Sequence, residues 1–214
     1  LDVVHAHYAI PHATAAYLAR QILVAKHPEQ VPAVITTLHG TDITLLGSDP
    51  SYSETVAFCI EQSDGVTAVS ESLRRDTYRE LGITKDIRVI PNFLDCSLHR
   101  RVDAERLRDR LIGAQSTKVL IHVSNFRPVK RTTAVVEVFA RVCREVPAHL
   151  LMVGDGPDRD RAARLAAELG VADRVHFLGE QDDVRPLLSI ASAFLLPSAQ
   201  ESFGLAALEA MACE

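Results

Sequence analysis

Two glutamates on either side of a glycine turn are the residues whose spacing most clearly suggests chemistry. Glu201 precedes Gly204, and Glu209 lies about one turn into the helix-forming run 205–212. A short apolar run ending at Pro197 comes before them, so the order predicts a strand, a loop and a helix start. Free N–H groups and the helix dipole would attract an anion there, and ionised carboxylates accept hydrogen bonds from vicinal hydroxyls. The stretch therefore fits a nucleotide sugar, although acidic residues also favour an ordinary helix start.

A basic pair follows an earlier predicted strand, 118–123. Arg127 and Lys130 surround Pro128, which suits a first helical turn, so we expect both near a helix start on the same side as the Glu201 loop. Arginine can hold a diphosphate through two parallel hydrogen bonds, and lysine adds a compact charge. Together they could neutralise the charge that grows on a departing diphosphate, as a divalent cation does elsewhere. The alternative is a solvated basic helix start.

Other motifs in this half of the chain favour no competing chemistry. The turn Gly154–Pro157 is not a dinucleotide fingerprint, because the third glycine of GxGxxG would fall at Arg159. The stretch Asp158–Asp160 has the DxD form of a metal-binding motif, but we interpret it as an acidic helix start. No Walker loop, GxSxG elbow or Cys/His nucleophile signature occurs. Glu201 and Glu209 could serve a glycoside hydrolase by count, but the basic pair favours a phosphate-bearing donor.

Histidines gather in the first half of the chain, at positions 5, 7, 12 and 39. Without an HExxH motif or cysteine partners, they do not predict a metal site. His39 follows a predicted strand in a glycine-bearing loop, and we expect it to face the cleft, where it could donate to a sugar hydroxyl or stabilise developing charge. Further polar residues after strand ends could hold an acceptor or be structural. They are Tyr8, His12, Thr41 and Asn92.

Alternating strands and helices must position these loops. Predicted strands cover 2–7, 33–38, 65–69, 87–90, 118–123, 148–153, 175–178 and 193–196, and predicted helices cover 12–25, 51–62, 71–81, 131–145, 158–169, 182–190 and 205–212. Asp49 and Ser70 are expected to cap helices, and Gly82 to end one. The alternation predicts parallel sheets with helices on both faces and ligands at the carboxyl ends of the strands.

A crowded charged stretch separates the two alternating series. We interpret residues 98–115 as a junction between an acceptor-binding domain, 1–97, and a nucleotide-sugar-binding domain, 116–214. The alternative is one polar crossover helix within a single sheet. The chain opens on Leu1-Asp2-Val3-Val4 and stops inside a predicted helix, so we expect a fragment of a longer enzyme.

Bulk properties exclude several classes of function. The 214 residues are 47% hydrophobic with a net charge of −5, which indicates a folded protein without general affinity for nucleic acid or anionic membranes. Four scattered cysteines without a CxxC favour a reducing, cytoplasmic location and argue against zinc. No apolar run approaches membrane-spanning length and no signal peptide is seen. The sequence leaves the oligomeric state open, a homo-oligomer included.

These segments resemble the retaining glycosyltransferases of family 4, which have the two-domain GT-B fold. The family signature is Glu, seven residues, Glu, which matches Glu201 and Glu209. The segments Ser124–Arg131, Gly154–Pro157 and 196–212 are also similar to family segments, and His7–Ala13, Thr36–Leu45 and Ile90–Phe93 are similar to those of members that glycosylate malate. The resemblance spans nearly the whole chain. It implies an α/β protein with two Rossmann-like parallel-sheet domains, both incomplete in this fragment.

The resemblance also implies an activity. It is the transfer of N-acetylglucosamine from UDP-GlcNAc to the hydroxyl of L-malate with retention of the α configuration, the first step of bacillithiol biosynthesis. No metal, cofactor or protein nucleophile is implied. The resemblance also implies that the leaving diphosphate takes the acceptor's proton, which agrees with the lack of an obvious base in this sequence. On the donor, the resemblance implies that Arg127 and Lys130 bind the diphosphate, Glu209 the ribose and Glu201 the sugar, with His39 near the reacting sugar. Further donor contacts are implied for Gly154, Ser202, Phe203, Gly204 and Leu205. The implied acceptor residues are Tyr8, His12, Thr41 and Asn92.

Other activities within the resemblance stay open. The acceptor could be an inositol phosphate or a lipid-linked sugar, and the protein could be a GT-B sugar-nucleotide epimerase or a non-catalytic nucleotide-sugar-binding protein. The family pattern begins with a strand and a glycine-rich loop that reaches the donor phosphates, and this chain starts after that loop. The piece by itself could therefore be inactive.

Overall fold

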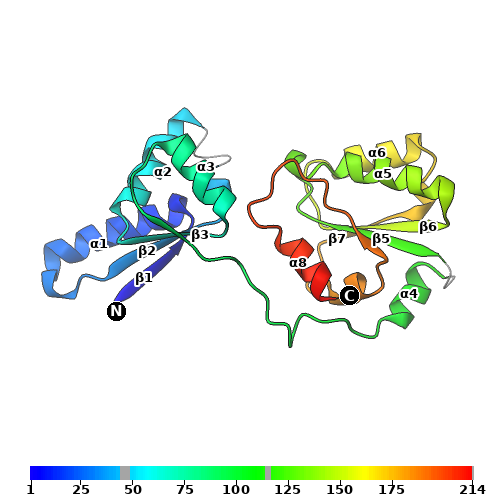
Figure 1. The fold of residues 1–214 in the computed structure, drawn as a ribbon, viewed down its shortest axis with the longest axis horizontal. Helices are drawn as coiled ribbons and strands as arrows, with labels where there is room; N and C mark the ends of the chain where they lie inside the picture. Colours follow the sequence, from blue (N-terminus) through cyan, green and yellow to red (C-terminus); the bar gives the residue numbers. More distant parts are fainter. Residues whose placement is uncertain (44–48, 114–116, 214) are drawn as a thin grey trace. The chain divides into compact units, whose positions relative to one another are not determined.

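The computed structural model describes residues 1–43, 49–113 and 117–213 of the chain. These form two compact units, Leu1–Asn92 and Phe93–Glu214, each built on a four-stranded parallel sheet (Figure 1). The two parallel-sheet α/β units expected from the alternation, and the Rossmann-like fold that the resemblance implies for them, are thus confirmed. Thr44 and Leu45 of the predicted acceptor motif, and residues 114 and 115 of the predicted junction, lie outside the described residues.

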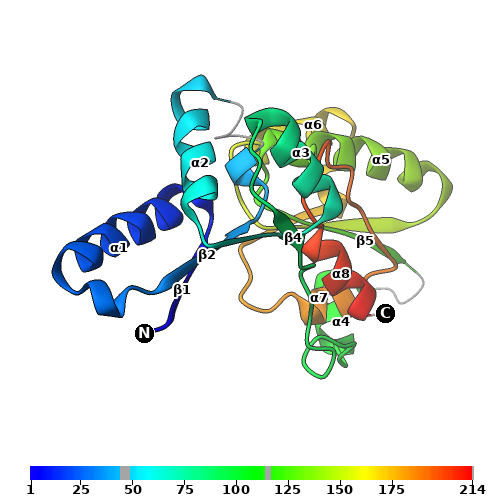
Figure 2. The same cartoon turned by 60° about the vertical axis from the view of Figure 1, so that its left-hand side comes forward.

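The first sheet places its strands side by side in chain order. These are β1 (Val3–His7), β2 (Ala33–Leu38), β3 (Gly65–Ala68) and β4 (Ile87–Val89), and they are joined through α1 (Thr14–Lys26), α2 (Pro50–Gln62) and α3 (Glu71–Leu81), with short turns η1 (Ala9–Ala13) and η2 (Pro28–Gln30). Right-handed crossovers that all advance in one direction put their helices on one face. Figures 1 and 2 show α1, α2 and α3 on the same side of the sheet. The prediction of helices on both faces is therefore wrong for the described part of this unit.

Side chains divide between the two faces of this first sheet accordingly. Val34 and Leu38 of β2 are buried under the helices with Val56 and Ile60 of α2. Residues of the opposite face are more exposed: the alternate β1 positions 3, 5 and 7 are all exposed. The core of this unit therefore lies between the sheet and one layer of helices.

The helix ends of the first unit form as their capping residues predict. The Asp49 side chain accepts a hydrogen bond from the Ser51 N–H at 2.8 Å, with Pro50 at the first helical position of α2. Ser70 Oγ accepts from the Leu73 N–H at 3.1 Å and caps α3. Gly82 ends α3 in the left-handed conformation, with φ 60°. These local signals confirm the predicted boundaries of both helices.

In the second sheet the order in which the chain adds strands reverses after β7 (Val175–Gly179), although all strands stay parallel. This reversal creates the edge at which a ligand is expected. The order of the strands is β7, β6 (Ala148–Val153), β5 (Lys118–Val123) and β8 (Ala193–Phe194). The chain moves from β5 outward to β7 and then returns to β8 on the other side of β5. Ligands of open parallel sheets bind at such a switch point, outside the carboxyl ends of the strands. The loops that follow β5 and β8 therefore occupy the expected position for a ligand site.

Helices cover both faces of this second sheet, as predicted. In Figure 1, α5 (Thr132–Glu145) and α6 (Arg159–Glu168) lie on one face, and α4 (Glu105–Leu111), α7 (Arg185–Ser189) and α8 (Leu205–Ala212) lie on the other. Two buried clusters correspond to the two faces. Phe139 packs with Leu150 and Met152 under α5, and Leu187 packs with Ile121 and Leu151 on the opposite side. Short turns η4 (Pro128–Lys130) and η5 (Ala172–Arg174) complete the unit.

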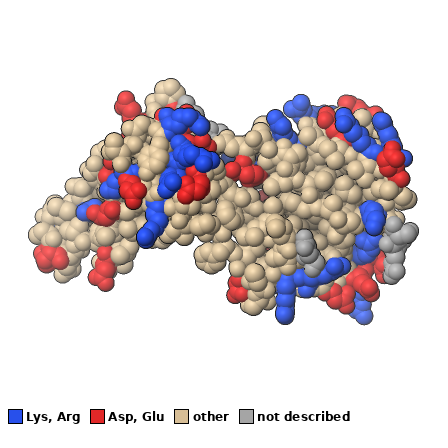
Figure 3. Space-filling view, in the orientation of Figure 1, with Lys and Arg blue, Asp and Glu red and all other residues tan. Residues whose placement is uncertain are grey.

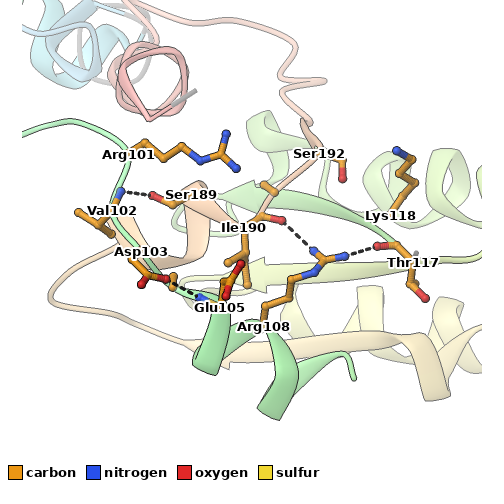
Figure 4. A pocket seen from close by; sticks show the side chains of 12 residues that line it. Arg101, Val102, Asp103, Glu105, Arg108, Thr117, Lys118, Ser189, Ile190 and Ser192 are labelled. Carbon is orange, nitrogen blue, oxygen red and sulfur yellow. Dashed lines mark hydrogen bonds between the residues drawn. The ribbon is translucent and has the colours of Figure 1, made fainter. Parts of the chain in front are cut away.

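The described part of the predicted junction lies inside the second unit. Leu107 and Leu111 of α4 pack against the cluster around Ile121. The Arg108 guanidinium donates to the Ile190 carbonyl at 3.2 Å and to the Thr117 carbonyl, beside a polar pocket of about 490 Å³ (Figure 4). This charged helix is therefore fastened to the amino end of the sheet, at the opposite end of β5 from the loop that bears Lys130.

Charges of both signs are mixed on the face shown in Figure 3. On α3, the Arg74 guanidinium lies 2.7 Å from Glu71 and that of Arg79 lies 2.8 Å from Asp76. Such exposed pairs contribute little to stability, but they show that the basic side chains here have acidic neighbours. Among the helices described, none is long and apolar enough to cross a membrane.

Candidate functional site

Two loops of the second unit meet beyond the carboxyl ends of β5 and β8. The Ala199 N–H donates to the Val129 carbonyl at 2.8 Å. Lys130 Nζ lies 2.6 Å from Glu201 Oε1, and the two side chains are 23% and 25% exposed. The basic segment and the glutamate turn therefore lie together, as their positions after neighbouring strands predict. The pair is a charge-assisted hydrogen bond at the rim of the site.

The backbone around Lys130 forms a short turn of its own just ahead of the helix predicted over 131–145. Pro128 opens the short turn η4 rather than α5, because Arg131 adopts the left-handed conformation with φ 51° and the α-helix begins only at Thr132. The Lys130 side chain is thus presented from a turn ahead of the helix. In the part of the chain that the structure describes, the Arg127 guanidinium forms no hydrogen bond or ion pair and is free to meet a ligand.

Backbone strain marks the same loop. Among the described residues, only Tyr8, Phe126 and Arg131 are non-glycine residues with positive φ, at 74°, 40° and 51°. Each such conformation costs on the order of 1–3 kcal/mol and persists where the surroundings enforce it, often at functional sites. Two of the three bracket Arg127 and Lys130, and Tyr8 lies in the histidine cluster of the first unit.

The glycines of the Gly154–Pro157 turn bring backbone against backbone. A Cβ at Gly154 would lie 1.9 Å from the Ser124 carbonyl oxygen, and one at Gly156 would lie 2.0 Å from that of Asn125. The Asp158 N–H also donates to the Phe126 carbonyl at 3.0 Å. The donor contact that the resemblance implies for Gly154 stays a prediction, and the structure adds a packing role, since its close approach to Ser124 supports the loop that bears Lys130.

The start of α8 presents the amides expected for an anion. Gly204 precedes the helix with φ 85°, and its carbonyl accepts from the Ala207 and Leu208 N–H groups at 2.9 and 3.2 Å. Ser202, Phe203 and Leu205 lie around this turn and are partly exposed or exposed. The first N–H groups of a helix have no intrahelical acceptor. This end of α8 therefore offers donors near the Lys130–Glu201 pair.

Glu209 lies further along α8 and is half-buried. Burial raises the pKa of its carboxyl, and the neighbouring His99 lowers it by less. Within residues 117–213, no hydrogen bond or ion pair joins Glu209 to Lys130. The two glutamates of the signature thus differ in their surroundings: Glu201 is paired with Lys130, whereas Glu209 is half-buried and interacts with His99.

Two buried hydroxyls beside this site lack partners. Thr132 Oγ1 and Ser198 Oγ are the side-chain atoms of the described residues that are buried without a hydrogen bond. Thr132 follows the Lys130 turn, and Ser198 lies in the loop that leads to Glu201. Buried polar groups are normally satisfied, so two exceptions in the two loops of one site are consistent with a polar ligand.

Part of the predicted acceptor set is assembled in the first unit. His39 Nε2 lies 2.8 Å from His7 Nδ1, the Tyr8 ring is 4.9 Å from that of His39, and His12 Nδ1 bonds the His7 carbonyl. Burial, and then the neighbouring His7, lower the pKa of His39, which favours its neutral form. Thr41 is exposed in the loop that follows β2. The structure therefore brings Tyr8, His12 and His39 together.

Asn92 does not join this group within the first unit. It follows β4, which lies at the edge of the sheet opposite β1, with β2 and β3 between them. Its position after a strand end is as predicted, but the strand order separates it from Tyr8. Sequence alone did not give that order.

Asp42 is a residue that sequence reasoning missed. Its side chain is fully buried, and it accepts from the Ala9 N–H at 2.6 Å and from the His39 N–H at 3.0 Å. Burial raises its pKa, and these hydrogen bonds oppose that rise. Asp42 therefore joins the loops after β1 and β2 that carry Tyr8 and His39. The available signal was a carboxylate in the His39–Asp42 loop directly after the predicted strand 33–38.

The acidic helix start at α6 does not resemble a metal site. Arg159 lies 3.9 Å from Asp155 and 3.8 Å from Asp160, as loose surface pairs. Across the ranges that the structure covers, no three His, Cys, Asp or Glu side chains are grouped as metal ligands would be. That the protein needs no metal stays a prediction.

Comparison with known proteins agrees with this geometry. The profile of the "Glycosyl transferases group 1" matches residues 103–214, and that of "Glycosyltransferase Family 4" matches residues 1–98. The chain is 50% identical over 213 residues to N-acetyl-alpha-D-glucosaminyl L-malate synthase of Bacillus anthracis, covering 100% of this chain and 55% of that protein. It is 32% identical over 164 residues to D-inositol 3-phosphate glycosyltransferase of Nocardia farcinica, covering 72% and 36%.

A solved structure gives the same fold. Anabaena HepE in complex with UDP and glucose matches 99% of this chain and 57% of its own, with a TM-score of 0.80 and 19% identity. At that identity the likeness shows the GT-B fold and no more. The chain spans about half the length of the B. anthracis relative.

Proposed function

The chain belongs to the family 4 glycosyltransferases, and on that premise we propose that the protein is a retaining, UDP-sugar-dependent transferase that moves N-acetylglucosamine from UDP-GlcNAc to the hydroxyl of L-malate. This is the first step of bacillithiol biosynthesis. The choice of donor and acceptor is supported by the 50% identity to the B. anthracis malate enzyme over the whole chain.

One observation carries the donor half of this proposal. Lys130 Nζ and Glu201 Oε1 are 2.6 Å apart at the switch point of the second sheet, next to the amino end of α8. In the free protein, the cation and the carboxylate neutralise each other. When the donor binds, Lys130 and Arg127 take the diphosphate, and Glu201 accepts hydrogen bonds from hydroxyls of the sugar. A single nucleotide sugar can thus replace the ion pair with two better-matched contacts.

The residues then suggest how the transfer proceeds. Charge accumulates on the diphosphate as the bond to the sugar breaks, and Lys130, Arg127 and the α8 amides are placed to stabilise it. The departing diphosphate accepts the proton of the malate hydroxyl, which attacks on the same face, so the configuration is kept. Neutral His39 donates to a hydroxyl of the transferring sugar, and Glu209 accepts from the ribose hydroxyls. No metal has a part in this scheme.

A second acceptor class has specific support. The N. farcinica relative acts, by its name, on D-inositol 3-phosphate, and it is 32% identical to this chain. An inositol phosphate would use the same donor site and differ only in the contacts made by the first unit.

The cytoplasmic location that we also propose is supported by the four cysteines, which are all free.

Malate-dependent release of UDP tests the proposed reaction. The protein, expressed from its complete gene, is incubated with UDP-GlcNAc and excess EDTA, with and without L-malate, and the anomeric configuration of the product is read by NMR. We expect UDP release only with malate, and an α-linked product. Release only with an inositol phosphate would show that this compound, and not malate, is the acceptor. Loss of activity in EDTA would contradict the metal-free mechanism. Binding without turnover would indicate a non-catalytic protein.

The pH dependence of donor binding tests the role of Glu209. Only the ionised carboxylate accepts from both ribose hydroxyls, so affinity is full above its pKa and is lost as the pH falls through it. Because burial raises that pKa, the loss should begin at higher pH than an exposed glutamate with a value near 4.5 would give. Calorimetric titration with UDP-GlcNAc checks this, since its diphosphate does not titrate in that range.

Glu209→Gln is the control for this pH effect. The variant should bind UDP-GlcNAc more weakly, and its affinity should no longer fall as the pH is lowered. A wild-type profile that stays flat down to the acid limit of folding would argue against the assignment, and so would a Glu209→Gln variant that keeps this fall in affinity.

A further inference from the structure

One buried histidine joins the two loops of the donor site. His122 lies on β5 and is 0% exposed. Its Nδ1 is 2.8 Å from the Leu195 carbonyl oxygen, in the segment that follows β8, and its Nε2 is 2.8 Å from Ser124 Oγ, in the loop that follows β5. The imidazole is thus a bridge between the segment leading to Glu201 and the segment leading to Lys130.

The chemistry of the partners fixes the state of this ring. A carbonyl oxygen can only accept, so Nδ1 carries the hydrogen and donates to Leu195. Ser124 Oγ accepts from the Phe126 N–H at 3.2 Å and can donate its own hydrogen to Nε2. The neutral Nδ1–H tautomer satisfies every group in this chain, and protonation would leave the Ser124 hydroxyl hydrogen without its acceptor.

The surroundings keep the ring neutral. Burial lowers the pKa of His122, the Leu195 hydrogen bond raises it by less, and of the charged groups that act on the ring, Lys130 lowers it while Glu201 raises it. These last two are the ion pair of the donor site itself. The neutral bridge described above is therefore the form present near neutral pH.

The bridge ends at the strained residue before the basic pair. Phe126 is fully buried with φ 40°, and its ring stacks on His122 with centroids 6.1 Å apart and 18° between planes. Arg127 follows directly. A left-handed phenylalanine persists only where its neighbours enforce it, and the contacts of Phe126 include the Ser124 hydroxyl and the His122 ring, beside the Asp158 N–H. An apolar residue at position 122 could fill the same space but could not make the two hydrogen bonds.

We propose that His122 is a positioning residue for the transfer reaction, which through Ser124 and Leu195 holds the Arg127–Lys130 loop and the Glu201 loop in register on one donor. This inference rests on the proposed function. His122 touches neither substrate in this scheme and acts only through the loops. Because a misplacement of about 1 Å can cost on the order of 100-fold in rate, the bridge should affect donor affinity and transfer as well as stability.

Comparison of two histidine substitutions in the protein expressed from its complete gene tests this role. His122→Phe keeps a ring and removes both hydrogen bonds, and His122→Asn keeps an N–H for Leu195. The matched control is His149→Asn, because His149 also lies in this sheet and makes a 2.8 Å bond, to His176, away from the two loops. Circular dichroism sets a temperature at which all variants are folded, and a variant that does not fold is replaced by Ser124→Ala.

We expect His122→Phe to lower kcat/KM for UDP-GlcNAc and to weaken UDP binding, each by about tenfold or more. His122→Asn should recover part of this loss, and His149→Asn should stay within about twofold of the unchanged protein. The double variant with Ser124→Ala should lose little more than His122→Phe alone. Values for His122→Phe within twofold of the unchanged protein, or an equal loss in His149→Asn, would overturn the proposal.

A spectroscopic measurement separates this inference from the proposed function. Ring ¹⁵N NMR of His122 should show the neutral Nδ1–H tautomer near neutral pH, whatever the protein acts on. An Nε2–H tautomer or a protonated ring would overturn the bridge even if transfer to malate were established. Absence of UDP binding by the unchanged protein would refute the proposed function, and the positioning role with it, while leaving the observed tautomer as a structural fact.

Discussion

Replacement of Lys130 with alanine is expected to lower the rate of transfer by about 100- to 1,000-fold. Lys130 lies 2.6 Å from Glu201 in a loop at the switch point of the second sheet, where we propose that it meets the leaving diphosphate. Loss of one group that stabilises charge in the transition state costs roughly this factor. The measurement is kcat with saturating UDP-GlcNAc and malate, for the protein expressed from its complete gene.

Lys118→Ala is the control for this substitution. Lys118 begins β5, so it lies at the opposite end of the same strand and is exposed. Its loss should leave kcat within about twofold, since exposed charges far from a site contribute little. Near-normal turnover in Lys130→Ala, or an equal loss in Lys118→Ala, would refute the role given to Lys130.

Replacement of Gly154 with alanine is expected to destabilise the second unit by about 2–6 kcal/mol. The new Cβ would lie 1.9 Å from the Ser124 carbonyl oxygen, and φ at this position is 110°. Overpacking against backbone and a strained φ each cost on the order of 1–3 kcal/mol, and neither can be relieved by rotating a side chain. Urea unfolding measures the change in the free energy of unfolding.

Gly170→Ala separates the two contributions. Gly170 also has a positive φ, 68°, but nothing lies within 4 Å of the position that its Cβ would take. This substitution should cost about 1–2 kcal/mol, the price of the conformation alone. If Gly154→Ala proved no more destabilising than Gly170→Ala, the close backbone packing between the two loops would be wrong. Gly154→Ala should also weaken UDP binding, because the Ser124 loop would move.

Most of the second unit was predictable because its signals are local. Apolar runs gave the strands, and Glu201, Gly204 and Glu209 fell at the carboxyl end of β8 and in α8, where parallel sheets bind ligands. The meeting of Lys130 with Glu201 followed from the same rule, since both follow neighbouring strands. The order of the strands in each sheet could not be predicted. That order decides where the helices lie, since only in the second unit does the chain return past β5 to β8 and so place helices on both faces of the sheet.

The remaining features depend on contacts that a single sequence does not display. Arg131 is an ordinary residue in the sequence, yet because of its left-handed conformation α5 begins at Thr132 and Lys130 lies in the separate turn η4. His122 reads as one polar residue in an apolar strand, and its two partners are two and 73 positions away. The resemblance places Gly154 on the donor, but only the coordinates show that the Ser124 carbonyl oxygen lies against this glycine.

A crystal structure of the complete protein with UDP-GlcNAc is the most direct test of the central claim. We predict that the diphosphate lies within hydrogen-bond distance of Lys130 and Arg127, the ribose on Glu209 and the sugar hydroxyls on Glu201, with the Lys130–Glu201 contact of the free protein broken. A nucleotide bound elsewhere, or one that leaves this ion pair in place, would contradict the account.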